Sequence, residues 1–208
     1  MPKNRIDTIV FDLGGVLVDW DPKYLYNKVF NNNTKRIESF LSEVCTPKWN
    51  MEQDAGRSFV EATQILIEKF PREEEYIRLF YDRWEEMIRG EVKGTVSLLE
   101  ALNRNSSHKL FALTNWSAET FPVALERFDF LAYFKGIVVS GEENTRKPFP
   151  EIYQILFERY SIHPASSVFI DDSLPNIETA VKLGMNGIHF RHPEQLASEL
   201  QAIDVPLH

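Results

Sequence analysis

The sequence predicts an α/β fold, a doubly wound parallel sheet into which an all-α helical segment is inserted. From about residue 95 onward, short apolar segments alternate with segments of helical period, which is typical of a parallel sheet covered on both faces. A further apolar segment lies alone at residues 6–11, and the residues between have helical periodicity only. We therefore expect a core formed by residues 1–19 and 91–208, with a helical cap formed by residues 20–90.

The first predicted strand, residues 6–11, ends just before Asp12 and is followed by a turn at Gly14-Gly15. The stretch from about Asp21 to Gly90 contains amphipathic helical faces and no strand signal. The second of these faces begins at a capping box, Ser58-x-x-Glu61. The three faces are Ile37, Phe40, Leu41 and Val44; Phe59, Ala62, Leu66 and Phe70; and Tyr76, Ile77, Phe80, Tyr81, Trp84, Met87 and Ile88.

The rest of the sequence alternates between the two periods. The predicted strands are residues 109–113, 136–139, 167–170 and 187–190. The predicted helices are residues 96–103, 117–127, 149–160 and 173–183, followed by a last helix with Leu196, Leu200 and Ile203 facing inward. The inward face of helix 149–160 is expected to be Phe149, Ile152, Leu156 and Tyr160.

Composition excludes several classes of function. The chain has 208 residues, of which 31 are acidic and 23 basic, so its net charge of −8 argues against nucleic-acid or anionic-membrane partners. A small anionic substrate remains compatible if a local cation offsets this charge. No apolar run is long enough to cross a bilayer or to form a signal peptide. Cys45 is the only cysteine, which fits a reducing cytoplasm, and we expect a cytoplasmic monomer or homodimer.

Polar side chains directly follow three of the predicted strands. Asp12 follows the first strand, Thr114 and Asn115 end the next, and Asp171 and Asp172 follow a later one. Ligands of open parallel sheets bind outside the carboxyl ends of the strands, so we expect these side chains at one rim. Each of them alone is explained by a turn or a helix cap. Together they are not, because several carboxylates at one rim are electrostatically costly without a cation.

Four segments occur in the order and rough spacing of the haloacid dehalogenase superfamily. They are FDLGGVLVD (11–19), LTN (113–115), RKPFPEIY (146–153) and VFIDDSLPNIETAVKLGM (168–185). The resemblance covers essentially the whole chain, and the helical insertion is similar to that superfamily's small α-helical cap. The sequence looks most like small bacterial sugar-phosphate phosphatases and the N-terminal phosphatase domain of soluble epoxide hydrolase. This resemblance implies a Rossmann-like core that hydrolyses a small phosphorylated metabolite, with a sugar phosphate as one candidate.

The resemblance also implies a role for each matching residue. Asp12 matches the nucleophile, which attacks phosphorus and becomes an aspartyl phosphate before water hydrolyses it. Thr114 and the backbone of Asn115 match the groups that bind the phosphoryl oxygens. Lys147 matches the lysine that offsets charge on the nucleophile and the phosphate.

A Mg²⁺ site is implied at the same rim. Asp12, the carbonyl of Gly14 and Asp172 match its ligands, with Asp171 a further ligand or a residue just behind them. Asn176 occupies the position that usually braces this acidic loop. Mg²⁺ prefers oxygen ligands in an octahedron, commonly one or two carboxylates together with substrate phosphate and water, and this donor set agrees with that preference.

One position departs from the phosphatase pattern. A second aspartate, the general acid for the leaving group, usually stands two residues after the nucleophile, where this sequence has Gly14. General acid catalysis is worth about 10²–10⁴-fold, so turnover is slow, the leaving group is good, or another residue substitutes. Asp19 and Asp21 are candidates, although turn and cap formation before Pro22 explains them more simply.

Two alternatives to a phosphatase therefore stay open. A 2-haloacid dehalogenase needs neither the acid nor a metal, but dehalogenases of this fold usually lack the acidic pair. A phosphate-binding relative without turnover is the other. We favour the phosphatase, because adjacent carboxylates in a cleft are costly without a cation.

Substrate specificity is expected to lie in the cap. Residues 49–57 mix polar and aromatic side chains with a glycine and show no helical period. We expect a loop that faces the rim, with Trp49, Glu52 or Arg57 touching the leaving group, and Arg57 is the predicted substrate contact. A solvated turn between cap helices is the alternative. Trp116 either lines the same opening or packs under the next helix.

Overall fold

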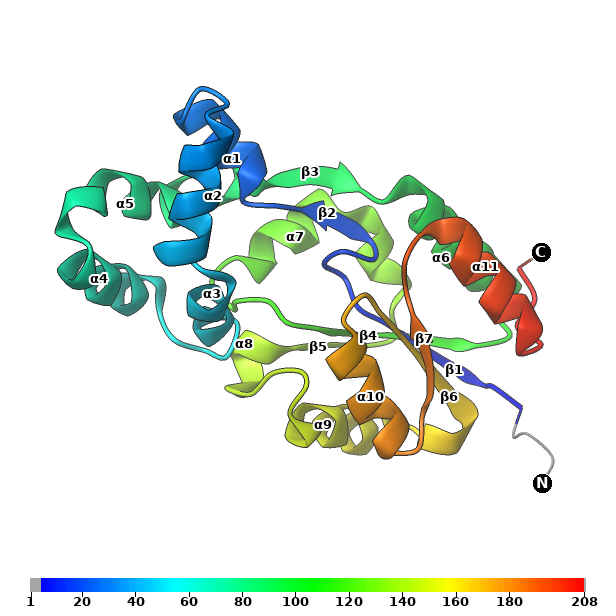
Figure 1. Ribbon diagram of the computed structural model, residues 1–208. Coiled ribbons are helices and arrows are strands. Elements are labelled where there is room, and N and C mark those ends of the chain that lie inside the picture. The colour runs from blue at the N-terminus through cyan, green and yellow to red at the C-terminus, as the bar shows by residue number, and fades with distance from the viewer. Residues whose placement is uncertain (1–4, 208) are drawn as a thin grey trace.

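The computed structural model describes residues 5–207 and contains a five-stranded parallel sheet (Figure 1). The strand order is β5-β4-β1-β6-β7, with bounds Thr8–Phe11 (β1), Lys109–Thr114 (β4), Ile137–Val139 (β5), Ser167–Asp171 (β6) and Asn186–His189 (β7). Each of these strands coincides with a predicted one, and the doubly wound α/β class is confirmed. Residues 1–4 and 208, which the expected core includes, lie outside the described residues.

The central strand, β1, positions the rim of the sheet. It pairs with β4 on one side and with β6 on the other, and its last residue, Phe11, is level with Ala112 and Ile170. Side chains that follow these three positions therefore emerge at the same rim. All residues of β1 and β6 are buried, which explains why their sequences are almost continuously apolar.

Helices cover both faces of the sheet (Figure 1). Ile9 and Phe11 pack in one hydrophobic cluster with α6, α7 and α11, while Val10, between them, packs in a second with α9 and α10. The bounds are Lys93–Asn105 (α6), Phe121–Arg127 (α7), Ser140–Glu143 (α8), Pro150–Tyr160 (α9), Leu174–Lys182 (α10) and Pro193–Ala202 (α11), with 3-10 turns at Asp129–Tyr133 (η3) and Pro164–Ser166 (η4).

Helices α1–α5 form a separate group beside the sheet (Figure 1), which we call the helical cap. Their bounds are Lys23–Val29 (α1), Thr34–Glu43 (α2), Pro47–Gln53 (α3), Phe59–Lys69 (α4) and Glu74–Asp82 (α5), with 3-10 turns at Pro71–Glu73 (η1) and Trp84–Met87 (η2). Aromatic rings fill its interior: the Tyr26 ring centroid lies 4.8 Å from that of Phe40 and 6.3 Å from that of Phe80. Two antiparallel strands, β2 (Val18–Trp20) and β3 (Ile88–Glu91), connect the helical cap to the core.

Three local expectations are wrong. No strand was expected within residues 21–90, yet β3 begins at Ile88, because pairing with β2 overrides the helical period that continues up to this residue. Residues 49–57 were expected to form a loop, whereas their first half belongs to α3. Phe149, expected to face inward, is 50% exposed, because it precedes the first turn of α9 instead of lying within the helix.

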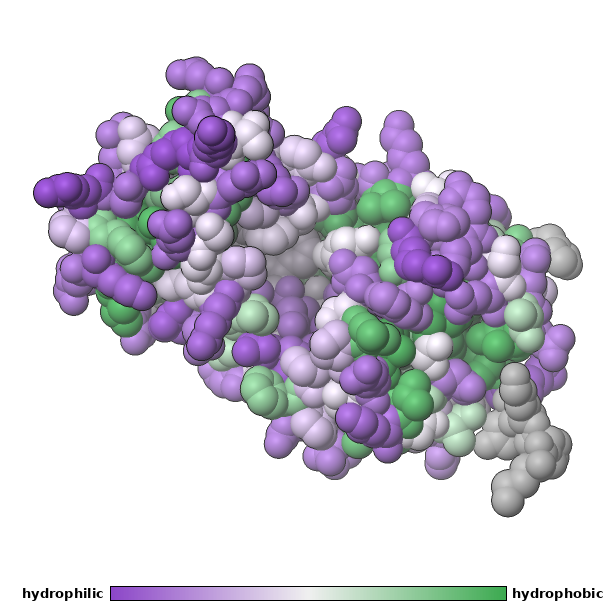
Figure 2. Space-filling model, in the orientation of Figure 1, coloured by the Kyte–Doolittle hydropathy of each residue, from purple (hydrophilic) through white to green (hydrophobic). Residues whose placement is uncertain are grey.

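The surface agrees with the composition of the sequence. In the face that Figure 2 shows, hydrophilic side chains prevail over the helical cap, and the surface is hollowed between the cap and the sheet. Within residues 5–207, no helix combines the length and the hydropathy that crossing a membrane requires.

Candidate active site

Three adjacent strand ends bring expected site residues together. Because β4, β1 and β6 are neighbours, Thr114 at the end of β4, Asp12 after β1 and Asp171 at the end of β6 lie side by side. All three residues are buried. The amide of Asp12 donates a hydrogen bond of 2.8 Å to the carbonyl of Ile170, so the pairing between β1 and β6 continues to this position. The sheet itself therefore determines where the Asp12 carboxylate lies.

Lys147 is a buried ammonium group between two carboxylates. Its Nζ lies 2.8 Å from Asp12 Oδ1 and 2.7 Å from Asp171 Oδ2. Buried charges require partners of opposite sign, and these two carboxylates supply them. Asn115 holds the backbone of Lys147, since its Nδ2 donates to the Lys147 carbonyl (3.0 Å) and its Oδ1 accepts from the Lys147 amide (2.8 Å). The sequence indicated only a backbone role for Asn115, so this side-chain contact was missed.

Asp171 is held by several donors besides Lys147. Asn176 Nδ2 lies 3.0 Å from each of its carboxylate oxygens, and the amide of Ser173 donates to Oδ1 at 2.8 Å. The hydroxyl of Tyr153 donates to the carbonyl of Asn176 (2.9 Å) and so anchors the bracing residue. Asn176 braces the acidic loop as expected, and both oxygens of Asp171 already accept hydrogen bonds.

Asp172 completes a group of three carboxylates. It is exposed, and its Oδ2 lies only 2.3 Å from where a Cβ at position 15 would stand, so Gly15, with a φ of +73°, makes room for it. Asp12, Asp171 and Asp172 offer oxygens that all lie within 4.8 Å of one another. Three carboxylates and the Lys147 ammonium leave two negative charges, which one divalent cation balances. Oxygen donors of this kind suit Mg²⁺, so the residues present fit this ion.

Burial and the neighbouring charges shift the pKa values of Asp12, Lys147 and Asp172. Burial raises the pKa of Asp12 well above its usual range; Lys147 opposes this shift, and Asp171 and Asp172 add to it. Burial lowers the pKa of Lys147, but the carboxylates of Asp12 and Asp171 outweigh it and the net shift is upward. Burial, followed by the charge of Asp171, also raises the pKa of Asp172. The cluster therefore carries more negative charge than one lysine stabilises.

Near Asp12, one buried hydroxyl group has no hydrogen-bond partner and one position has empty space beside it. Thr114 Oγ1 is buried and has no hydrogen-bond partner among the described residues. An unsatisfied buried hydroxyl costs about 1–3 kcal/mol, so a ligand oxygen at this point would be favoured. At Gly14, apart from the glycine and its two chain neighbours, no heavy atom lies within 4 Å of the place a Cβ would occupy. The position that usually carries the general acid is thus open space.

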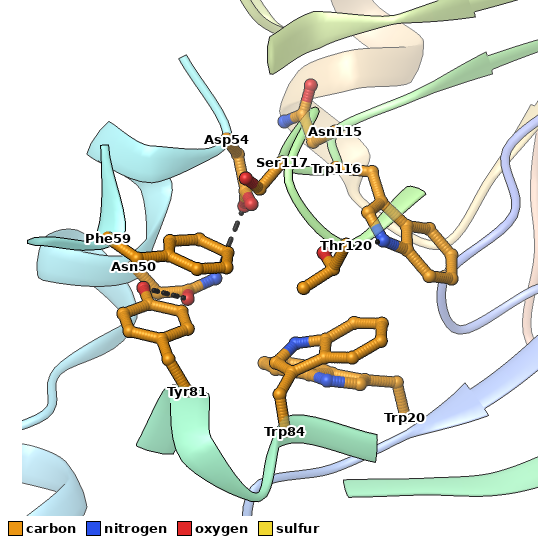
Figure 3. A pocket seen from close by; sticks show the side chains of 11 residues that line it. Trp20, Asn50, Asp54, Phe59, Tyr81, Trp84, Asn115, Trp116, Ser117 and Thr120 are labelled. Carbon is orange, nitrogen blue, oxygen red and sulfur yellow. Dashed lines mark hydrogen bonds between the residues drawn. The ribbon is translucent and has the colours of Figure 1, made fainter. Parts of the chain in front are cut away.

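A pocket between the core and the helical cap opens beside Gly14 (Figure 3). Its lining residues are Gly14, Trp20, Asn50, Asp54, Phe59, Tyr81, Trp84, Asn115, Trp116, Ser117 and Thr120. Trp84 of the cap and Trp116 of the core meet edge to face with ring centroids 5.7 Å apart. Trp116 also donates from Nε1 to Thr120 Oγ1 (3.1 Å), so it both lines the pocket and packs against the next segment. The pocket reaches the rim of the sheet at Gly14 and Asn115, and the rest of its lining is largely aromatic.

The residues expected to reach this pocket from residues 49–57 do not line it. Trp49 is buried and donates from Nε1 to the carbonyl of Ala62 (3.2 Å). Glu52 is exposed, and the Arg57 guanidinium donates to Gln53 Oε1, with its terminal nitrogen at 2.6 Å. In this structure the Arg57 side chain is therefore engaged within the helical cap.

Asn50 and Asp54 line the pocket instead, and sequence reasoning missed both. Asn50 lies in α3 and Asp54 is its C-cap residue, four positions later, so both are presented on one face. Thr46 caps this helix by accepting from the Trp49 amide (3.1 Å), and Pro47 occupies its first turn. A threonine cap followed by proline is a helix-start signal that would have identified α3.

Comparison with known proteins identifies the family to which this sequence belongs. The haloacid dehalogenase-like hydrolase family matches residues 6–184. A phosphorylated carbohydrates phosphatase of Thermotoga maritima is 28% identical over 192 residues, which cover 88% of this chain and 84% of that protein. Drimenol cyclase drtB of Aspergillus calidoustus is 24% identical over 201 residues, or 95% of this chain, but the chain spans only 36% of that longer protein.

A solved structure shows the same fold. A HAD family enzyme of Bacteroides thetaiotaomicron, in complex with magnesium and inorganic phosphate, superposes with a TM-score of 0.67 at 22% identity, covering 90% of this chain and 95% of that one. At this level of identity the likeness establishes the fold alone. The family match, in contrast, covers most of the sequence, from the first strand to the end of α10. The chain therefore belongs to the haloacid dehalogenase-like hydrolases.

Proposed function

We propose that this hydrolase is a Mg²⁺-dependent phosphatase that hydrolyses a small phosphorylated metabolite through an aspartyl-phosphate intermediate. One observation carries the proposal: Lys147 Nζ lies between the carboxylates of Asp12 and Asp171, next to Asp172. A nucleophile, a fixed cation and an acidic cluster with excess negative charge are the groups that phosphoryl transfer requires.

The proposed reaction has two steps at Asp12. The Asp12 carboxylate attacks phosphorus and the bond to the leaving oxygen breaks; water then hydrolyses the aspartyl phosphate. Lys147 offsets the negative charge of the nucleophile and the phosphoryl group. The Thr114 hydroxyl and the Asn115 amide bind the phosphoryl oxygens, which would supply the partner that Thr114 Oγ1 lacks.

The carboxylate cluster would hold Mg²⁺. Asp12, Asp172 and the carbonyl of Gly14 are the proposed ligands, and the magnesium and phosphate complex of the Bacteroides enzyme supports this choice of ion. When bound, Mg²⁺ neutralises negative charge on the carboxylates and on the phosphoryl oxygens. Because Lys147, Asn176 and Ser173 already occupy both oxygens of Asp171, we propose that Asp171 mainly orients the cluster.

The leaving group is proposed to lie in the pocket beside Gly14. Its aromatic rings offer an apolar surface, and Asn50, Ser117 and Thr120 offer hydrogen bonds. This lining suits a metabolite with both an apolar face and hydroxyl groups. A sugar phosphate remains one candidate, and the name of the Thermotoga relative supports it.

The same reasoning limits the partners and the location. The net charge of −8 argues against a nucleic-acid partner. Cys45 is a buried free thiol, and we propose a cytoplasmic location on that basis. Assembly as a monomer or a homodimer stays a prediction.

Dehalogenation and binding without turnover are the two competing functions. The test uses p-nitrophenyl phosphate with Mg²⁺ and with EDTA, beside halide release from 2-chloropropionate. We expect phosphate release that EDTA abolishes. Halide release that persists in EDTA, with no phosphatase activity, would contradict the proposal.

The Asp12→Asn variant separates an enzyme from a binder. We expect turnover to fall by about 10⁴-fold or more, since the nucleophile is lost, while inorganic phosphate still binds. A wild-type protein that binds phosphate with Mg²⁺ but turns over none of a broad panel of phosphate esters would be the binder.

A further inference from the structure

The open space at Gly14 raises the question of which group protonates the leaving oxygen. Asp54 is the one carboxyl among the residues that line the pocket beside Gly14, and it belongs to the helical cap (Figure 3). We propose that Asp54 is the general acid for the leaving group, reaching it across the pocket from the side opposite the sheet. This inference rests on the proposed phosphatase function and deepens it.

Hydrogen bonds hold the Asp54 carboxyl on the pocket side of α3. Asn50 Nδ2 donates to Asp54 Oδ2 at 3.3 Å, and the hydroxyl of Tyr81 donates to Asn50 Oδ1 at 3.2 Å (Figure 3). Gln53 Nε2 in turn donates to the hydroxyl of Tyr81 (2.7 Å). This chain of neutral groups orients the carboxyl without supplying a charge that would keep it ionised.

Close contacts seat this part of the helical cap on the core. A Cβ at Gly56 would lie 2.3 Å from Asn144 Oδ1, and Gly56 adopts a φ of +102°, so only glycine allows this approach. The amide of Phe59 donates to Glu119 Oε1 across the same boundary (2.7 Å). Asp54 therefore lies on a segment that is held against the core. The core residue that it contacts, Asn144, comes shortly before Arg146 and Lys147 in the chain.

The environment of Asp54 keeps a proton available near neutral pH. Burial raises the pKa of its carboxyl to about 7, although the charges of Arg146 and Lys147 oppose the shift. No lysine or arginine among residues 5–207 forms an ion pair with it. A general acid works best when its pKa lies near the working pH, which this one satisfies.

The other candidate carboxyls are engaged elsewhere. Asp19 accepts from the hydroxyl of Tyr24 (2.8 Å), and Asp21 Oδ1 accepts from the amide of Lys23 (2.8 Å) at the start of α1. Neither residue lines the pocket that contains Gly14. Asp21 thus has the turn role that the sequence indicated before Pro22, whereas Asp19 lies in β2 and accepts from a tyrosine hydroxyl instead.

The proposed step balances without a further reactant. As Asp12 bonds to phosphorus, the bond between phosphorus and the leaving oxygen breaks, and that oxygen takes the proton of Asp54 and departs as an alcohol. In the second step the Asp54 carboxylate takes a proton from water as the water oxygen bonds to phosphorus. The bond between phosphorus and the Asp12 oxygen breaks, so inorganic phosphate leaves and the Asp12 carboxylate and the Asp54 acid are both restored.

The test is a comparison of leaving groups in Asp54→Asn. p-Nitrophenolate leaves without a proton, whereas glycerol 2-phosphate needs one. We expect the ratio of kcat/KM for p-nitrophenyl phosphate to that for glycerol 2-phosphate to rise by about 10²-fold or more. Glu52→Gln, an exposed carboxyl on the same helix, is the matched control and should leave the ratio unchanged.

Gly14→Asp provides a second, independent variant. Apart from Gly14 and its two chain neighbours, no heavy atom lies within 4 Å of a Cβ at this position, so there is room for a side chain that would supply an acid from the core side. When Gly14→Asp is combined with Asp54→Asn, we expect the activity on glycerol 2-phosphate to be at least tenfold higher than in Asp54→Asn alone. If Asp54→Asn reduces both substrates equally, or Gly14→Asp rescues nothing, the assignment of Asp54 is wrong. A wild-type protein inactive on both substrates would instead overturn the proposed phosphatase function.

Discussion

The two sides of the candidate site, the charged rim of the core and the lining that the helical cap contributes to the pocket, are built on different physical principles. On the core side, two strand ends place the buried carboxylates of Asp12 and Asp171 around one buried lysine, and each charge is held by another charge or by a backbone amide. On the side of the helical cap, four aromatic rings and neutral hydrogen-bonding groups line the pocket together with a single carboxyl. The difference indicates that the core is suited to phosphoryl chemistry and the helical cap to the organic part of the substrate.

After the loss of the nucleophile in Asp12→Asn, the largest expected effect comes from removing the central cation on the core side. Lys147→Met leaves Asp12 and Asp171 as buried carboxylates without their common partner. We expect kcat to fall by about 10²–10³-fold and the free energy of unfolding in metal-free buffer to fall by about 3–5 kcal/mol. Urea denaturation and steady-state kinetics measure the two effects. If the free energy of unfolding of Lys147→Met equals that of the wild type, the buried ion pairs make no net contribution to stability.

A second comparison separates the two adjacent carboxylates. Asp172→Asn is expected to weaken Mg²⁺ binding by about 100-fold with little loss of stability, because Asp172 is exposed. Asp171→Asn is expected to lower stability more than Mg²⁺ affinity, because the oxygens of Asp171 hold Lys147, Asn176 and Ser173. Calorimetric Mg²⁺ titration and the metal-dependent rise in melting temperature report the two properties. The reverse pattern would make Asp171 the main ligand.

The pH dependence tests the cap side. Burial raises the pKa of Asp54 to about 7, so its carboxyl is protonated below this pH and loses its proton above it. A proton donor is active in its protonated form, so kcat/KM for glycerol 2-phosphate should fall about tenfold per pH unit above 7. The fall should be absent in Asp54→Asn. A wild-type profile that is flat between pH 7 and 9 on this substrate would count against Asp54 as the donor.

The smallest effect is expected at Arg57. Its guanidinium donates to Gln53 Oε1 and to the carbonyl of Trp49 within the helical cap. Arg57→Gln should lower the free energy of unfolding by about 1–2 kcal/mol and change KM by less than about threefold. A rise in KM of tenfold or more would restore Arg57 as a substrate contact, reached after the cap moves toward the core.

Much of the fold follows from local pattern. The strands of the sheet were predictable because buried parallel strands are nearly continuously apolar and end where a polar residue begins, as β1 does at Asp12 and β6 at Asp171. The meeting of these residues was also predictable, since parallel strands end at a common rim. In contrast, β3 could not be read from its own residues, because it exists through pairing with β2, more than sixty positions earlier in the chain.

The sequence by itself determined the α/β class, the rim residues and, at Gly14, the missing acid. Only the tertiary structure decided how Asn115 holds Lys147, and that Asn50 and Asp54 face the rim in place of Trp49, Glu52 and Arg57. The reason is physical. The hydrophobic period of a segment reports which face is buried, but the side of a small helix that meets another unit depends on contacts such as those of Gly56 with Asn144 and of Phe59 with Glu119, which join residues distant in the chain.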